Sequence, residues 1–330
     1  MPRIVAAFVV SLLAGLAIAP AIIFLLKKIK ARQSILVYVT QHKDKQGVPT
    51  MGGIIFLIAT SIGFFLFTKG QRTLSVVSYV VFLTYGSVGL IDDGIKAIFK
   101  RNLGLKAYQK VISQAVIAAL VTYYCYTNEY VGGAVYLPFS GRYAHLSWWY
   151  LPVCFTAFIA TTNAVNLTDG LDGLAGSVSA VYLAFIGVFI FTLQREKADL
   201  GQTVYAQELF NLLILCVSCM GAIVSFLWFN TSRASVFMGD TGSLALGGLA
   251  CVLPVMIKNL FLIAFVGIIF VVSVISVIVQ VLSFKIRKRR VFLMAPVHHH
   301  LEMKGYTESK IMSFYVIITI IFGSLAILFW

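Results

Sequence analysis

Most of the potential chemistry of this sequence rests on five aspartates, each placed where a long apolar segment meets a polar loop: Asp92, Asp93, Asp169, Asp172 and Asp240. Ionisable groups so close to apolar segments are costly and usually face a polar cavity. Asp92 and Asp93 are adjacent and repel each other, so a cation or metal ion is needed against them. Lys96 lies one helical turn after Asp92. Carboxylates with a nearby cation suit a magnesium ion together with a phosphate.

Two glycine-rich motifs hold the other three aspartates. In NAVNLTDGLDG, residues 163–173, Asn166, Asp169 and Asp172 are spaced by three, so on a helix they stay within one half of its surface. In FMGDTGS, residues 237–243, Asp240 precedes a helix that we expect to begin near residue 243. Backbone N–H groups at a helix start favour an anion, and a carboxylate beside them can hold a metal that bridges to it. A helix-capping role is the alternative for each aspartate taken singly.

Two further segments could contact a ligand. His298, His299 and His300 are consecutive, so their side chains diverge and suit phosphate or sugar contacts better than a shared metal. The basic run at 285–290, just before them, suits an anionic lipid surface. Lys45 and Thr50 lie in a polar loop that ends in Gly-Gly at a helix start, which can bind phosphate. A solvated loop is the alternative for that last segment.

The composition shows what must position these residues. Of 330 residues 60% are apolar and 12% are charged, against about 25% charged in an average soluble domain. The mean hydropathy is +0.93. These values exclude a soluble enzyme, a secreted disulfide scaffold and a disordered regulator. The five cysteines lie in or beside apolar runs, where they serve as small packing residues.

The apolar segments predict an all-α polytopic membrane protein with ten transmembrane helices, in a single integral-membrane domain over residues 1–330. The expected spans are 4–26, 52–68, 74–92, 109–127, 147–165, 174–193, 207–229, 243–258, 260–283 and 311–330. Ten spans put both termini on one side. Loops of the other side, with the adjacent helix edge, carry 19 of the 26 Lys and Arg residues, so we expect that side to be cytoplasmic and both termini extracytoplasmic.

The same charge distribution bears on partners. Most of the net charge of +14 is explained by the Lys and Arg residues of the expected cytoplasmic loops. We therefore expect the protein to lie in a lipid bilayer and to have no nucleic-acid partner. A small extracytoplasmic hairpin is expected near residues 130–146, where a Gly-Gly pair interrupts alternating aromatic residues.

Taken in order, these motifs resemble the polyprenyl-phosphate N-acetylhexosamine-1-phosphate transferase superfamily and, within it, the phospho-N-acetylmuramoyl-pentapeptide transferase family. The deciding string is APVHHHLE at 295–302; PTMGG, DDGIK, NAVNLTDGLDG and FMGDTGSLALGG also match. The resemblance runs from about residue 30 to about residue 310. The sequence departs from the family in the first cytoplasmic loop, where 32–41 lacks a Gly-Pro pair and Val48 stands where a threonine is common.

The resemblance implies a homodimer of ten-helix chains in the bacterial cell membrane, with the active site facing the cytoplasm. It implies a magnesium-dependent sugar-1-phosphate transferase (a glycosyltransferase) of peptidoglycan synthesis, and so of cell-wall biogenesis, cell shape and cell division. The reaction would join UDP-N-acetylmuramoyl-pentapeptide to undecaprenyl phosphate, giving undecaprenyl-diphospho-N-acetylmuramoyl-pentapeptide (lipid I) and UMP.

The family and the residue types together suggest roles for the site residues. The expected catalytic residues are Asp92, Asp93 and Asp240, with Asp240 and Asp169 as the expected metal ligands. Asp92 would deprotonate or orient the lipid phosphate, and Phe237 would stack on uracil. The residues expected to bind substrates are Lys45, Thr50, Lys96, Lys110, Asn166, Asp169, Asp172, Asn230, Phe237, Gln280, His298, His299 and His300.

Two other functions stay open at this point. One is a sister transferase that uses UDP-N-acetylglucosamine. The other is a proton-coupled transporter, because acids inside a membrane mark ion paths. A transporter predicts acids near the middle of the membrane, whereas these acids lie at the expected cytoplasmic edge.

Overall fold

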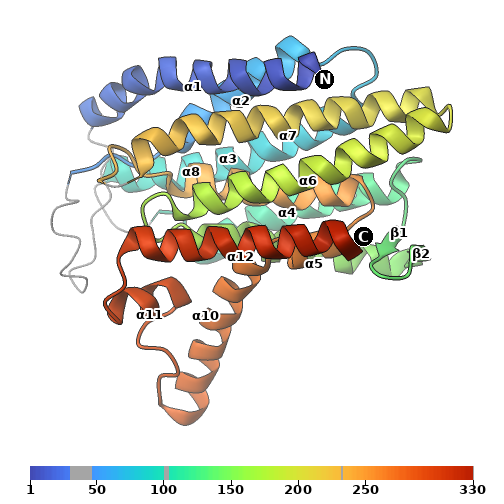
Figure 1. Cartoon of the computed structure of the whole chain (residues 1–330). Helices are drawn as coiled ribbons and strands as arrows, with labels where there is room; N and C mark the ends of the chain where they lie inside the picture. The colour runs from blue at the N-terminus through green and yellow to red at the C-terminus, as the bar shows by residue number, and fades with distance from the viewer. Residues whose placement is uncertain (30–46, 100–103, 232, 330) are drawn as a thin grey trace.

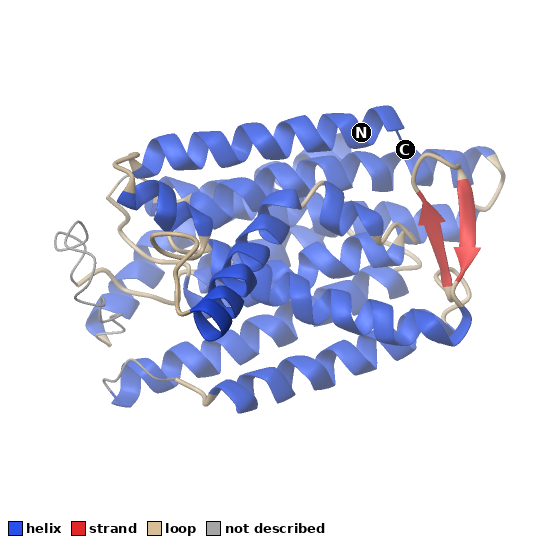
Figure 2. Ribbon diagram, turned by 90° about the horizontal axis from the view of Figure 1, so that it is seen from below, coloured by secondary structure: helices blue, strands red, loops and turns tan. Residues whose placement is uncertain are grey.

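The computed structural model describes residues 1–29, 47–99, 104–231 and 233–329, and most of them are helical. The helices are α1 (Pro2–Lys28), α2 (Gly53–Phe67), α3 (Thr73–Phe99), α4 (Ala107–Thr127), η2 (Ser147–Trp149), α5 (Tyr150–Thr168), α6 (Leu174–Asp199), α7 (Thr203–Asn230), α8 (Gly239–Met256), α9 (Phe261–Phe265), α10 (Ile268–Arg287), α11 (Val297–Met303) and α12 (Glu308–Phe329). The helices form one bundle, from which α10 departs obliquely (Figures 1 and 2).

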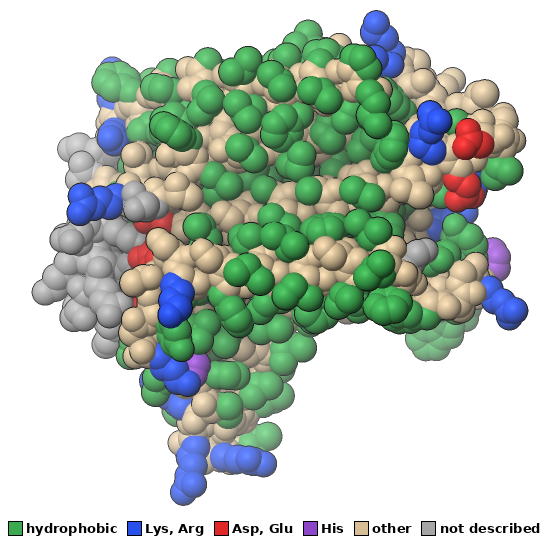
Figure 3. All heavy atoms as spheres, viewed as in Figure 1, with side chains coloured by type: hydrophobic (Ala, Val, Ile, Leu, Met, Phe, Trp, Pro, Cys, Tyr) green, Lys and Arg blue, Asp and Glu red, His purple; other side chains and the backbone are tan. Residues whose placement is uncertain are grey.

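The prediction of an all-α, multi-pass membrane protein is confirmed. Among the described residues, eight helical segments are long and apolar enough to cross a membrane: α1, α3, α5 with η2, α6, α7, α8, α10 and α12. The α2 helix is apolar but has 15 residues, and α4 is not among the eight, so the number ten stays a prediction. Apolar side chains cover the visible face of the bundle, while lysines and arginines gather at its ends and at the tip of α10 (Figure 3).

The α8 helix forms the centre of the bundle. Every residue from Thr241 to Met256 is buried, and α8 packs against α3 and α5. Its glycines permit this, because a side chain at Gly247 would strike the backbone of Thr162 on α5. Small residues let helix backbones approach closely inside a membrane.

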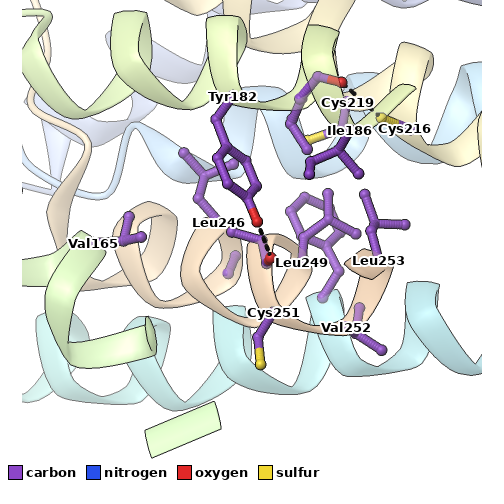
Figure 4. Close-up of a cluster of buried hydrophobic side chains, with 14 of the residues drawn as sticks. Val165, Tyr182, Ile186, Cys216, Cys219, Leu246, Leu249, Cys251, Val252 and Leu253 are labelled. Atoms are coloured by element: carbon purple, nitrogen blue, oxygen red, sulfur yellow. Dashed lines mark hydrogen bonds between the residues drawn. The ribbon is translucent and has the colours of Figure 1, made fainter. Parts of the chain in front are cut away.

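The cysteines serve packing in this core. The Tyr182 hydroxyl of α6 donates a hydrogen bond to the Ala250 carbonyl oxygen of α8 (2.7 Å; Figure 4). Nearby, the Cys216 thiol of α7 donates one to the Leu183 carbonyl oxygen of α6 (3.3 Å). All five cysteines are buried and free of disulfides, in line with the packing role expected from the sequence.

Both termini lie at one end of the bundle, together with the predicted hairpin (Figure 1). The hairpin is confirmed: β1 (Ala134–Leu137) pairs antiparallel with β2 (Arg142–His145), with Ala134 opposite His145. The opposite end carries α11 and the start of α8 (Figure 1). An even number of membrane crossings agrees with this arrangement.

At three places the helices differ from the expected membrane spans in ways that matter for the site. The α8 helix begins at Gly239 rather than near 243, because Gly239 adopts a φ of 72° and turns the chain, so Asp240 lies in the first helical turn. The α3 helix continues to Phe99 rather than ending at 92, since its acids face the protein interior and find partners there. The segment 260–283 is broken near Gly267 into α9 and α10.

At the end that carries the termini, a buried acid of α7 supports α3. The Glu208 side chain is 2% exposed, and its two carboxylate oxygens accept hydrogen bonds from the backbone N–H groups of Thr73 (2.9 Å) and Leu74 (2.8 Å). The first N–H groups of a helix have no partner within the helix, so Glu208 satisfies two of them and complements the positive end of the helix dipole. This cap is invisible in the sequence, because its members are 134 residues apart.

We predict that Glu208→Ala lowers the stability of the protein by about 1–2 kcal/mol, the range for the loss of a helix cap. The variant leaves two backbone N–H groups without their acceptor, and that of Leu74 is buried. Thermal unfolding in detergent would measure the effect as a lower melting temperature. Glu196→Ala, at an exposed position near the same end, is the control and should melt like the wild type. Equal melting temperatures for Glu208→Ala and the wild type would contradict the capping role.

Candidate active site

Three carboxylates from two helices converge at the end of the bundle opposite the termini. Asp92 and Asp93 come from the penultimate turns of α3, and Asp240 from the first turn of α8. One oxygen of each lies within 4.8 Å of the others. The ammonium group of Lys96 lies among them, with its Nζ 2.6 Å from Asp92 Oδ2, 3.5 Å from Asp93 Oδ1 and 3.0 Å from Asp240 Oδ2. This lysine supplies the cation that the adjacent aspartates require.

Asp240 is the meeting point of four helices. Besides Lys96 of α3, its Oδ2 accepts a hydrogen bond from Lys110 Nζ of α4 (2.8 Å). Its Oδ1 accepts one from Asn166 Nδ2 of α5 (2.7 Å). Asn166 Nδ2 also donates to Ser243 Oγ of α8 (2.8 Å), which fixes the orientation of the amide. The structure therefore brings together six of the residues expected at the site: Asp92, Asp93, Lys96, Lys110, Asn166 and Asp240.

The other two carboxylates are held in part by groups that sequence reasoning missed. Asp93 Oδ2 accepts hydrogen bonds from the backbone N–H (2.9 Å) and the hydroxyl (2.8 Å) of Thr241 at the start of α8. Asp92 Oδ1 accepts one from the backbone N–H of Leu105 (2.7 Å). Thr241 follows Asp240 directly, so its position in the sequence could have indicated a place in the site. The donor of Leu105 is a backbone N–H, which the residue type does not reveal.

Close backbone contacts bring the predicted PTMGG and FMGDTG motifs together. The Gly52 N–H donates to the Phe237 carbonyl oxygen (2.8 Å), and the Phe237 N–H donates to that of Pro49 (2.8 Å). Thr50 is buried beside Gly239, where a side chain on that glycine would crowd the Thr50 hydroxyl and the Asp93 carboxylate. Thr50 and Phe237 thus border the carboxylate cluster. Contact of Phe237 with uracil stays a prediction.

The DGLDG loop lies beside the cluster. Asp169 follows the last residue of α5, and burial together with the nearby carboxylates of Asp240 and Asp93 raises its pKa to about 8. Asp172 Oδ2 accepts a hydrogen bond from the Ala234 N–H (3.2 Å). Asn230 accepts one from the Gly173 N–H (3.0 Å) and donates one to the Val236 carbonyl oxygen (2.9 Å). Asp172 and Asn230 therefore tie this loop to the chain before α8, and their contact with substrate stays a prediction.

The three histidines do not all diverge, in contrast to the prediction from their adjacency: the ring centroids of His298 and His299 lie 4.4 Å apart, and only His300 points away. His298 is fully buried against Gly170, and burial lowers its pKa to about 3. His299 Nδ1 lies 3.0 Å from Glu302 Oε2. His300 points elsewhere, because its Nδ1 accepts a hydrogen bond from the Leu293 N–H (3.1 Å). His298 and His299 thus border the DGLDG loop and could meet a ligand there.

Gln280, expected to bind substrate, forms hydrogen bonds with the backbone of its own chain. Its Oε1 accepts hydrogen bonds from the N–H groups of Val291 and Phe292 (both 3.0 Å), and its Nε2 donates to the Phe292 carbonyl oxygen (3.0 Å). In this arrangement Gln280 holds the connection between α10 and α11. Lys45, also expected to bind substrate, lies outside the described residues.

The donor set at the cluster fits magnesium. Three carboxylates from Asp92, Asp93 and Asp240 offer hard oxygen ligands within one small volume, which is the type of ligand that Mg²⁺ takes in phosphate-handling sites. Asp169, expected as a second metal ligand from the sequence, is not one of these three carboxylates.

Comparison with known proteins agrees with this arrangement of motifs. The family model of glycosyl transferase family 4 matches residues 74–258, which include the carboxylate cluster. A phospho-N-acetylmuramoyl-pentapeptide-transferase of Clostridium novyi (strain NT) is 41% identical over 319 residues, which cover 96% of this chain and 93% of that protein. Proteins of the same name from Clostridium perfringens (strain SM101 / Type A; 98% of this chain, 96% of that protein) and Clostridium kluyveri (strain ATCC 8527; 96% and 94%) are each 40% identical. The chain therefore belongs to glycosyl transferase family 4 and, within it, to the phospho-N-acetylmuramoyl-pentapeptide transferase family.

Proposed function

We propose that this protein transfers phospho-N-acetylmuramoyl-pentapeptide from UDP-N-acetylmuramoyl-pentapeptide to undecaprenyl phosphate. The products are lipid I and UMP, in the first membrane step of peptidoglycan synthesis. The name shared by its relatives supports this reaction. The observation that carries it is the convergence of three carboxylates and two lysines at one end of a bundle of apolar helices. Such a site suits phosphates that approach a membrane surface.

The chemistry needs alignment and charge neutralisation more than covalent help. An oxygen of the lipid phosphate attacks the β-phosphorus of the UDP-sugar and forms a new phosphoanhydride. The bond from that phosphorus to the bridging oxygen breaks, and UMP leaves with that oxygen. Lys96 and Lys110 would neutralise phosphate oxygens, and Asp92 would deprotonate or orient the attacking phosphate. One anhydride replaces another, so the reaction is reversible.

Magnesium has a place in this proposal. Asp240, with Asp92 and Asp93, would hold the ion, and a bound magnesium would supply positive charge to the phosphate oxygens as negative charge develops on them. Asp169 would shape the nucleotide side of the site. His298, His299 and His300 would lie toward the sugar-peptide or the nucleotide.

The topology follows from the charges. We place the carboxylate cluster on the cytoplasmic face of a bacterial cell membrane, because the loops predicted to share its side carry 19 of the 26 Lys and Arg residues. The UDP-sugar would then arrive from the cytoplasm, and the chain would act as a homodimer with ten crossings. The acids lie near the ends of α3 and α8 rather than in mid-helix, so this arrangement does not favour a proton-coupled transporter.

A radiolabel assay tests the proposal. Purified protein with undecaprenyl phosphate and magnesium would receive UDP-N-acetylmuramoyl-pentapeptide or UDP-N-acetylglucosamine, each labelled in the sugar. We expect labelled lipid from the first sugar and not from the second. Product from UDP-N-acetylglucosamine alone would identify a sister transferase, and no product from either would reject the enzyme function.

Lys110 provides a sharper prediction within this function. Lys110→Met should lower kcat roughly 100-fold, because a preorganised charge near the transferring phosphate is lost. Lys106→Met, at the residue just before the same helix, is the matched control, since Lys106 is exposed and its ammonium group lies over the Tyr108 ring. Initial rates of UMP release would be compared for the two variants and the wild type. Equal losses in both variants would mean that Lys110 has no special role.

A further inference from the structure

A hydrogen bond between two side-chain amides joins α4 to α5 inside the bundle. Asn163 Nδ2 donates to Gln114 Oε1 (2.8 Å) and also to the Ile159 carbonyl oxygen of its own helix (2.8 Å). Gln114 is fully buried. Neither amide takes part in the mechanism described above.

This amide pair lies about one helical turn from the residues of α4 and α5 that contact Asp240. Lys110 precedes Gln114 by four residues on α4, and Asn166 follows Asn163 by three on α5, so each pair shares a helix face. Lys110 Nζ and Asn166 Nδ2 bind different oxygens of the Asp240 carboxylate, at 2.8 and 2.7 Å. A shift of α4 along α5 would therefore pull one of these donors away from the carboxylate.

The same level is also tied to α3. The Tyr85 hydroxyl donates to the backbone carbonyl oxygen of Gln114 (3.3 Å). Tyr85 is fully buried and precedes Asp92 by seven residues, which is two helical turns. Three helices that carry cluster residues, α3, α4 and α5, thus meet at Gln114.

Packing alone does not account for an amide at position 114. Its Nε2 has no hydrogen-bond partner among the residues that the structure describes, and a buried N–H without an acceptor is destabilising. A leucine of similar size would fill the space without that penalty. Of the buried residues that follow on α4, Ala118, Val121 and Cys125 are apolar or small, and Thr122 is the other polar one. Contacts of that kind fix the axial position of two membrane helices less strictly than a directed hydrogen bond does.

We infer that Gln114 and Asn163 are positioning residues: their hydrogen bond sets α4 against α5 so that Lys110 and Asn166 meet on Asp240. This inference rests on the proposed function. It concerns two residues that touch no cluster carboxylate in the structure and act through Lys110 and Asn166.

The test compares activity with stability in Gln114→Leu. We expect kcat for sugar-phosphate transfer to fall roughly 10- to 100-fold, the scale of effect from misplaced catalytic groups. The melting temperature should stay unchanged or rise, which a merely structural role would not produce. Ser113→Ala, next to Gln114 on α4, is the control, because its hydroxyl donates to the Gln109 carbonyl oxygen of its own helix. Asn163→Ala should lose activity as Gln114→Leu does. It replaces Gln114→Leu in the test if the leucine variant does not fold.

Two combinations separate positioning from other causes. Exchanging the pair, as Gln114→Asn with Asn163→Gln, keeps the combined side-chain length and should restore most of the activity. Gln114→Leu combined with Lys110→Met should lose less activity than the product of the two single losses, because both changes act on the contact between Lys110 and Asp240. Wild-type activity in Gln114→Leu would overturn the inference, and so would a loss that follows a lower melting temperature and is not recovered by the exchange. An inactive wild type in the same assay would reject the proposed function itself, and the inference with it.

Discussion

Replacing Asp240 with alanine should reduce sugar-phosphate transfer by about 1,000-fold or more, the upper range for loss of a preorganised electrostatic group. Asp240 is the acceptor for Lys96, Lys110 and Asn166, so its removal leaves two ammonium groups and an amide without their common partner. It also removes one of the three carboxylates that would hold magnesium. Lys96 would then stay with Asp92 and Asp93 rather than face a phosphate.

The measurement is the initial rate of UMP release by purified protein in detergent. Asp199→Ala, an exposed acid at the end of α6, is the control and should keep wild-type activity. Melting temperatures of both variants would exclude misfolding as the cause. An Asp240→Ala protein that folds and keeps activity within about tenfold of the wild type would contradict its assignment to the metal site.

Replacing Gly89 with alanine should damage both folding and activity. A β-carbon at Gly89 of α3 would collide with the backbone carbonyl of Asp240 and the N–H of Thr241 on α8. These neighbours are main-chain atoms in the most buried helix, so they cannot rotate away. The helices must separate, at a loss of about 3 kcal/mol, the upper range for overpacking a core. Their separation would also withdraw Asp92 and Asp93 from Asp240 and lower activity roughly 100-fold.

The matched control lies on the same helix. A β-carbon at Gly94 would meet the Met51 methyl carbon at 3.6 Å, which is an ordinary contact. Gly94→Ala should therefore fold and work like the wild type, since alanine also favours the helix. Thermal unfolding and UMP release would be measured for both variants. Similar behaviour of Gly89→Ala and Gly94→Ala would show that the α3–α8 contact does not hold the cluster.

The carboxylate cluster could be anticipated from the sequence because charge is rare in this chain. Where 12% of residues are charged, an aspartate at the edge of an apolar segment stands out, and partners such as Lys96 lie within one helical turn. Asn166 stands out through its spacing from Asp169 and Asp172, whereas Lys110 is suggested by its residue type together with the family resemblance.

Other parts of the site could not be anticipated, and the reason is physical. The N–H groups of Leu105 and Thr241 donate from the main chain, whose donors are the same for almost every residue type. Gln280 binds a backbone segment 11 to 12 residues away, and residue type does not separate that use from substrate binding. The expected apolar span ends at residue 92, but the α3 helix continues to Phe99. Hydrogen bonds from other parts of the chain, such as that from the Leu105 N–H to Asp92, stabilise its buried acids.

The most direct test of the account follows the transferred phosphorus. UDP-N-acetylmuramoyl-pentapeptide labelled with ³²P at the β-phosphate would be incubated with purified protein and magnesium, with and without undecaprenyl phosphate. Direct attack in the carboxylate cluster predicts label in the lipid extract when undecaprenyl phosphate is present, and none on the protein in either case. Label on the protein when undecaprenyl phosphate is absent would contradict direct attack, and no labelled lipid in its presence would contradict the proposed function.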